Sequence, residues 1–129
     1  MADDRVAIVQ RFMNAISASD LEALLAESHP DGELIPLVSA WPQPYHGHDG
    51  VREWWADLNG TWDEFTVQYE DSRELDDGAL LVNIHWRARG RGGHPVVEGP
   101  SVVVFRFRDG KVLSAHVFVD ERRALSSLG

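Results

Sequence analysis

Three side chains in this sequence stand where they could perform acid/base chemistry: Glu33, Tyr45 and Asp120. A carboxyl group that is buried in an apolar cavity acquires a raised pKa and can then exchange protons near neutral pH. A tyrosine hydroxyl can donate a hydrogen bond to a reacting oxygen. We therefore take these three residues as the catalytic candidates.

Asp120 stands at the end of the last predicted strand, immediately before a predicted helical tail. Strict alternation along that strand places Asp120 on the face opposite Ala115 and Val117, unless a bulge re-aims its side chain. Aspartate is also a favoured N-terminal cap of helices. Asp120 is thus either an acid/base group or the cap of the helix at residues 121–128.

Glu33 shares strand parity with Ile35, so both side chains can project toward the interior of the domain. In that position Glu33 would be a buried carboxylate, and burial disfavours the charged form of such a group. The alternative is a glutamate at the rim, either in water or paired with Arg5 or Arg11.

The predicted loop between the first strand and the third helix is rich in proline and aromatic residues. Trp41 and Tyr45 in it either form a lid that supplies the tyrosine hydroxyl or pack against the body of the protein. His46 and His48 with Asp49 superficially resemble metal ligands, but a third ligand at a defined spacing is missing. We therefore expect no metal site, and His48 or Asp49 can simply cap the next helix.

The elements that must position these residues follow from the spacing of apolar side chains. Three- and four-residue spacing predicts helices at 3–18 and at 49–59. A second, short helix begins at a capping box of Ser19 with Glu22 and ends at a break at 29–32. Residues 121–128 are predicted to form a helical tail. Alternation predicts strands at 33–38, at 65–69, at 80–88 and along both arms of a hairpin at 101–120.

The hairpin at 101–120 organises the rest of the chain. Asp109-Gly110 is a two-residue turn signal that favours positive φ and closes a tight hairpin. Val103 and Phe105 share one face of its first arm, and the other face is also partly apolar. Such a ribbon is unstable alone in water, so other elements must cover at least one face.

Helices first and then a meander of four long strands predict an α+β fold. We expect residues 1–129 to form a single domain, with a curved antiparallel sheet and the N-terminal helices packed on its concave face.

Composition excludes several classes of partner. Twelve basic and 21 acidic residues give a net charge of -9, which argues against nucleic acid and anionic membranes. The absence of cysteine excludes disulfides and thiolate metal sites. No apolar run approaches the roughly 18–20 residues of a membrane span, and no signal-peptide pattern begins the chain, so we expect a cytoplasmic protein.

Four segments in this order resemble the SnoaL-like branch of the nuclear transport factor 2-like superfamily: 9–12 (Val-Gln-Arg-Phe), 19–22 (Ser-Asp-Leu-Glu), 47–55 (Gly-His-Asp-Gly-Val-Arg-Glu-Trp-Trp) and 105–112 (Phe-Arg-Phe-Arg-Asp-Gly-Lys-Val). The resemblance implies a cone-shaped α+β barrel whose helices close one end around a small-molecule pocket. It also implies a homodimer through the sheet. Ketosteroid isomerases, polyketide cyclases, limonene epoxide hydrolases and dehydratases share this fold, so the fold alone does not give the function.

The departures from the enzymes of the family are informative. The resemblance places the isomerase's tyrosine, its aspartate base and its protonated aspartate at Phe12, Ile35 and Val103, and all three are apolar here. Steroid isomerisation by that mechanism is therefore not expected. Asp120 matches the place where the polyketide cyclases carry an acid/base aspartate, although their surrounding Trp-Asp pattern is replaced here by His116-Val117.

The same resemblance predicts a mostly hydrocarbon and aromatic pocket wall that suits a small hydrophobic molecule. Its expected ligand-binding residues are Phe12, Ile16, Ile35, Trp41, Trp54, Trp55, Val82, Ile84, Trp86, Val103, Phe105, Ala115 and Val117. His85 and His116 lie on the faces of their strands that point away from this predicted pocket.

Two hypotheses follow for the function. The first is a cofactor-independent acid/base enzyme acting on a hydrophobic metabolite as an isomerase, cyclase, dehydratase or hydrolase. The second is a non-catalytic module that binds a hydrophobic ligand, and a dimeric association module is its variant. An ionisable side chain that reaches the cavity favours the first, an apolar open cavity the second, and a collapsed cavity with a large apolar interface the variant.

Overall fold

The computed structural model describes residues 2–36, 45–92 and 94–128. As predicted, the chain begins with helices, and its long strands follow one another in its second half. In chain order the elements are α1 (Ala2–Ser17), α2 (Leu21–Glu27), β1 (Ser28–Ile35), β2 (Tyr45–His46), α3 (Gly47–Thr61), β3 (Trp62–Glu74), β4 (Leu80–Gly90), β5 (Val96–Arg108), β6 (Lys111–Phe118) and α4 (Glu121–Leu128).

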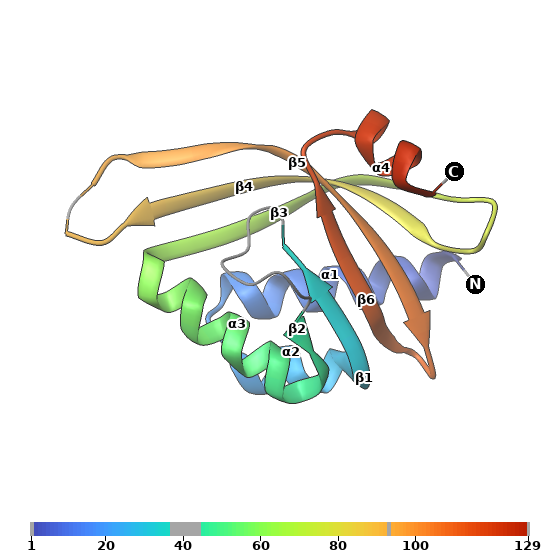
Figure 1. Cartoon of the computed structure of the whole chain (residues 1–129), viewed down its shortest axis with the longest axis horizontal. Helices are drawn as coiled ribbons and strands as arrows, with labels where there is room; N and C mark the ends of the chain where they lie inside the picture. Colours follow the sequence, from blue (N-terminus) through green and yellow to red (C-terminus); the bar gives the residue numbers. More distant parts are fainter. Residues whose placement is uncertain (1, 37–44, 93, 129) are drawn as a thin grey trace.

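The strands form one curved, unclosed sheet in the order β2-β1-β6-β5-β4-β3. Strand β1 runs parallel to β6, and every other neighbouring pair is antiparallel. Figure 1 shows α1, α2 and α3 on one side of this sheet and α4 on the other. The predicted α+β fold, with the N-terminal helices on the concave face, is confirmed.

Both faces of the central hairpin are covered. Val103 and Phe105 on its concave face belong to the main apolar cluster, together with α1, α2 and α3. Val102 and Val104 on the convex face belong to a second cluster that Ala124 of α4 completes. The short tail helix therefore protects apolar surface that the N-terminal helices cannot reach.

The turn between β5 and β6 has the predicted geometry. Asp109 has a φ of 54° and Gly110 a φ of 75°. Two successive central residues with positive φ define the tight hairpin turn whose twist matches that of the flanking strands. This local signal fixes the turn itself, and the pairing of β5 with β6 is irregular close to it, between Arg106 and Phe107.

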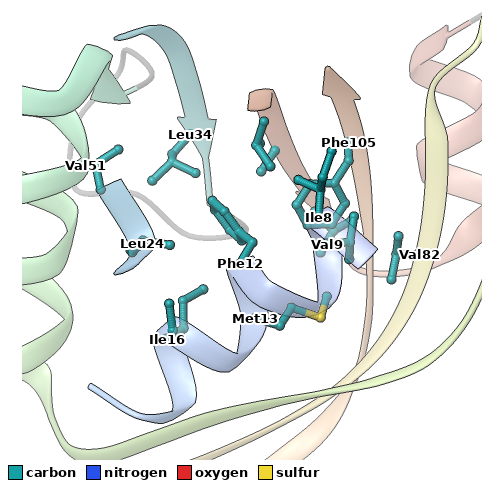
Figure 2. Close-up of a cluster of buried hydrophobic side chains, with 14 of the residues drawn as sticks. Ile8, Val9, Phe12, Met13, Ile16, Leu24, Leu34, Val51, Val82 and Phe105 are labelled. Atoms are coloured by element: carbon teal, nitrogen blue, oxygen red, sulfur yellow. The ribbon is translucent and has the colours of Figure 1, made fainter. Parts of the chain in front are cut away.

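Helix α1 covers part of the concave face of the sheet with an apolar stripe. Val9, Phe12, Met13 and Ile16 recur at helical spacing and are all buried. Figure 2 shows them on the side of α1 that faces Phe105 of β5. The rings of Phe12 and Phe105 meet edge to face with their centroids 5.6 Å apart, a favourable aromatic geometry.

The predicted capping box at the start of α2 is shifted by one residue. The cap is Asp20, whose Oδ1 accepts from the backbone N–H of Ala23 at 3.1 Å. Ser19 instead adopts a φ of +57° and ends α1 by donating its backbone N–H to Ile16 O. Because Ser19 is needed to stop one helix, the next residue begins the other.

Strand β1 begins earlier than predicted. Residues 29–32 end α2, as expected, but they already belong to β1, which runs from Ser28 to Ile35. The pairing of β1 with β6 is irregular between Ser28 and Glu33, and beyond that point Leu34 pairs with Ala115. Residues 37 and 38, the end of the predicted strand, lie outside the described part of the chain.

Among the described residues, none of the helices combines the length and the apolar character that crossing a membrane requires.

Candidate functional site

A cavity of about 290 Å³ lies between the helices and the concave face of the sheet, and it is partly open to solvent. Its volume is near the lower end of the range for small-molecule sites. The described residues that line it come from α1, α3, the end of β1 and strands β3 to β6: Phe12, Met13, Ile16, Leu34, Ile35, Pro36, Trp54, Leu58, Trp62, Phe65, Val67, Ile84, Trp86, Ser101, Val103, Phe105, Ala115 and Val117.

Most of the wall predicted from the sequence lies around this cavity. The predicted residues that line it are Phe12, Ile16, Ile35, Trp54, Ile84, Trp86, Val103, Phe105, Ala115 and Val117. Val82 does not; it is fully buried in the core beside α1 (Figure 2). Trp55 is also outside the lining, because consecutive helical residues point about 100° apart and Trp54 takes the inward direction. Trp41 lies outside the described residues.

The wall also contains residues that the sequence argument missed: Met13, Leu34, Pro36, Leu58, Trp62, Phe65, Val67 and Ser101. Several of them carried a usable signal. Leu58 follows Trp54 by one helical turn, and Phe65 alternates with Val67 along β3. Ser101 shares a face with Val103. Leu34 carried no such signal, because its direction depends on its pairing with Ala115 of β6, which is distant in the sequence.

No ionisable side chain lines the cavity among the described residues. The sequence of residues 37–44, which are not described, contains none either. Phe12, Ile35 and Val103, which the predicted resemblance matches to the isomerase catalytic positions, are all part of this wall. The described part of the wall therefore offers no proton donor or acceptor of tunable pKa to a bound molecule.

Asp120 caps α4. Its Oδ1 accepts from the backbone N–H of Arg123 at 2.8 Å, and its carbonyl accepts from Ala124. The side chain is exposed and is not part of the cavity lining. The geometry is that of the capping alternative, since β6 ends at Phe118 and Asp120 directly precedes α4.

Glu33 also lies away from the cavity, contrary to the predicted inward direction. It pairs with Ser114 of β6 in the register, and its half-exposed carboxylate stands 3.9 Å from Nδ1 of His46. The next residue, Leu34, pairs with Ala115 of β6, and both line the cavity. Arg5 and Arg11, the partners considered for Glu33, pair with Glu74 and Glu27.

Tyr45 is buried, and its hydroxyl donates to Oδ2 of Asp57 at 2.6 Å. This bond joins β2 to α3, and Tyr45 is not part of the cavity lining. The packing alternative thus describes its position. A catalytic role for Tyr45, Glu33 or Asp120 stays a prediction without support from the geometry.

The described histidines do not lie together in a cluster that could bind a metal ion. Nε2 of His48 donates to the backbone carbonyl of Ser28 at 2.8 Å, and Nε2 of His85 lies 2.8 Å from Glu98 on the convex face. Within residues 2–36, 45–92 and 94–128, no group of three or more His, Cys, Asp or Glu side chains could hold a metal ion.

His116 lies on the convex face, where its ring stacks on Phe118 with 4.0 Å between the centroids. Burial lowers the pKa of His116 below its usual 6.5, because a protonated imidazole loses hydration there. The unfolded chain then binds the proton more tightly than the folded chain does. The contribution of this group to stability is therefore complete above pH 6.5 and is lost as the pH falls through the folded-state pKa.

We expect His116→Gln to flatten part of the pH dependence of stability. Denaturant unfolding of both proteins between pH 5 and pH 8 measures this. The difference in free energy of unfolding between wild type and variant should be constant above pH 6.5 and should shift in favour of the variant at lower pH. An unchanged difference at pH 5.5 and pH 7.5 contradicts the assigned direction.

One polar contact stands in the apolar wall. Nε1 of Trp86 donates to Oγ of Ser101 at 3.1 Å. Both side chains line the cavity, and Ser101 is only 3% exposed. Among the described residues, the lining thus combines aromatic surface with the hydroxyl of Ser101.

Comparison with known proteins places this arrangement in a family. The family model of the SnoaL-like domain matches residues 9–115. No curated protein sequence matches the chain.

Several solved structures share the fold at low sequence identity. TerC, co-crystallised with polyporic acid, superposes with a TM-score of 0.79 at 19% identity over 97% of each chain. A protein from Catenulispora acidiphila with a ketosteroid isomerase-like fold, in complex with trimethylamine, gives a TM-score of 0.75 at 16% identity over 92% of this chain and 89% of that chain. A protein from Jannaschia sp. CCS1, provisionally assigned as a SnoaL-like polyketide cyclase, gives 0.75 at 17% over 96% and 90%.

Proposed function

This chain belongs to the family of SnoaL-like domains, and from that premise we propose that its cavity binds one small, flat, apolar molecule without acid/base help from the wall. The observation that carries the proposal is an open cavity of about 290 Å³ whose described lining contains no ionisable side chain. When a ligand displaces water from apolar surface of this kind, the free energy of the system decreases, which favours binding.

The shape preference comes from the aromatic side chains. Trp54, Trp62 and Trp86 line the cavity together with Phe12 and Phe105. Aromatic rings favour other rings in offset or edge-to-face contact. A ligand of two or three fused rings suits both this wall and the modest volume.

The charge preference comes from what the wall lacks. A charged ligand would leave water without meeting an opposite charge in the described lining, and such desolvation is costly. The net charge of -9 further disfavours anions. The proposed ligand is therefore neutral.

The two other hypotheses have less support. An acid/base enzyme needs a proton-transfer group near the ligand, whereas Glu33 and Asp120 lie outside the lining. An association module predicts a collapsed cavity, and this cavity is open. TerC with polyporic acid and the Catenulispora protein with trimethylamine hold small molecules on the same fold, which agrees with a binding role. A homodimer through the sheet stays a prediction.

Phenanthrene, a neutral molecule of three fused rings, tests the proposal. Because Trp54, Trp62 and Trp86 line the cavity, bound phenanthrene should change the intrinsic tryptophan fluorescence in a saturable way. Val117→Phe puts extra volume into the cavity and should weaken binding about tenfold, the result of roughly 1.4 kcal/mol of overpacking. Titration of both proteins gives the two dissociation constants.

Val119→Phe is the matched control. Val119 carries the same side chain two residues along the chain, but it is exposed and outside the lining. Its dissociation constant for phenanthrene should equal that of the wild type. If phenanthrene does not bind, or if both variants weaken it equally, the cavity is not the binding site.

A further inference from the structure

We propose that Ser101 determines ligand specificity by donating a hydrogen bond from its hydroxyl to a neutral carbonyl oxygen of the bound molecule. The proposal deepens the binding function above and rests on it. It adds a substrate class: flat apolar ketones, quinones or aldehydes in preference to plain hydrocarbons.

The direction of the Trp86–Ser101 hydrogen bond leaves a hydrogen to donate. An indole Nε1–H can only donate, so in the 3.1 Å contact Oγ of Ser101 must be the acceptor. A serine hydroxyl has one hydrogen as well as two lone pairs. Among the described residues, no acceptor bonds to that hydrogen, and the bond from Trp86 restricts the directions in which it can point.

The sheet register holds this pair at the cavity. Ser101 of β5 stands opposite Ile84 of β4, and Trp86 stands opposite Gly99. A Cβ placed on Gly99 would lie 3.7 Å from the Trp86 ring, so the ring packs closely over this glycine. The indole therefore reaches along β5 toward Ser101, and both side chains face the ligand space.

The chemistry of the wall selects the acceptor. A hydrocarbon that fills the cavity would bury the hydroxyl hydrogen without a partner, and a buried unpaired polar group is unfavourable. A carboxylate could accept the hydrogen, but the described lining has no cation to balance its charge. A neutral carbonyl satisfies the hydroxyl without that penalty.

The ligand pair 9-fluorenone and fluorene tests this, because the two molecules have the same ring system and differ at the carbonyl. Equilibrium dialysis gives the affinity ratio of the two ligands for each protein. We expect Ser101→Ala to reduce the preference for fluorenone by about three- to tenfold relative to the wild type, the effect of one neutral hydrogen bond. Ser101→Thr keeps a hydroxyl and should retain the preference.

Ser114→Ala is the matched control, since Ser114 lies on the opposite face of the sheet and outside the lining. Its affinity ratio should equal that of the wild type. Infrared spectroscopy adds a direct signature that a packing effect would not move. The carbonyl stretch of fluorenone should shift to lower frequency in the wild-type complex and lose that shift in Ser101→Ala.

The outcomes separate the two proposals. Fluorene and fluorenone binding at the cavity with an affinity ratio that Ser101→Ala does not change overturns the role of Ser101 and leaves the binding function standing. An unshifted carbonyl stretch in the wild-type complex overturns it as well, even if the variant does not fold. Failure of both ligands to bind overturns the binding function and this inference with it.

Discussion

Replacing Phe105 with alanine should lower the free energy of unfolding by about 3–5 kcal/mol, the usual loss for a buried phenylalanine. Phe105 is 1% exposed and stands where the sheet meets α1. It contacts Phe12 edge to face at 5.6 Å and stacks with Phe107 at 6.4 Å. Because domains are stable by only about 5–15 kcal/mol, this loss is a large part of the total.

Phe118→Ala provides the comparison for this prediction. Phe118 is half-buried on the convex face of the same sheet and stacks on His116. Its removal deletes the same atoms from a less enclosed place, so the expected loss is clearly smaller. Denaturant unfolding of the two variants measures both losses, and equal losses would falsify the central role assigned to Phe105.

Gly50→Ala should lower the free energy of unfolding by about 3 kcal/mol, the upper end of the range for overpacking. A Cβ on Gly50 would lie 2.6 Å from the backbone carbon of Tyr45 and 3.1 Å from its Cα. Backbone atoms cannot move aside as a flexible side chain can. The substitution therefore pushes β2 away from α3 and strains the bond between Tyr45 and Asp57, whose atoms are 2.6 Å apart.

Gly60→Ala is the matched control in the same helix. Nothing lies within 4 Å of a Cβ at Gly60. Alanine there should stabilise the protein by up to about 1 kcal/mol, because it restricts the unfolded chain and favours helix. Thermal or denaturant unfolding checks both signs, and a stabilising Gly50→Ala would show that β2 does not rest on α3 as described.

The fold of this chain and the side chains that line its cavity are separate kinds of evidence about its chemistry. The fold is shared with proteins described as isomerase-like and cyclase-like. Fold alone does not carry activity, because chemistry depends on the side chains at the site. Here Phe12, Ile35 and Val103 give the wall apolar surface, and in the described lining Trp86 and Ser101 form a polar contact, which is the basis of the recognition proposed above.

Local patterns in the sequence were enough to predict the fold. The Asp109-Gly110 turn requires only two residues with positive φ, and the apolar stripe of α1 requires only helical spacing. The tail helix at Glu121–Leu128 matches its prediction to the residue. Such features depend on neighbours in the chain, so the amino-acid order determines them directly.

Tertiary structure alone decided which candidates face the cavity. Glu33 points away because it pairs with Ser114 of β6, whereas Leu34 pairs with Ala115, which lines the cavity. Asp120 caps a helix because β6 ends at Phe118. Ser101 meets Trp86 only because β4 and β5 pair in one register. The sequence by itself determined most of the elements and much of the apolar wall, and the long-range register determined which other side chains stand in that wall.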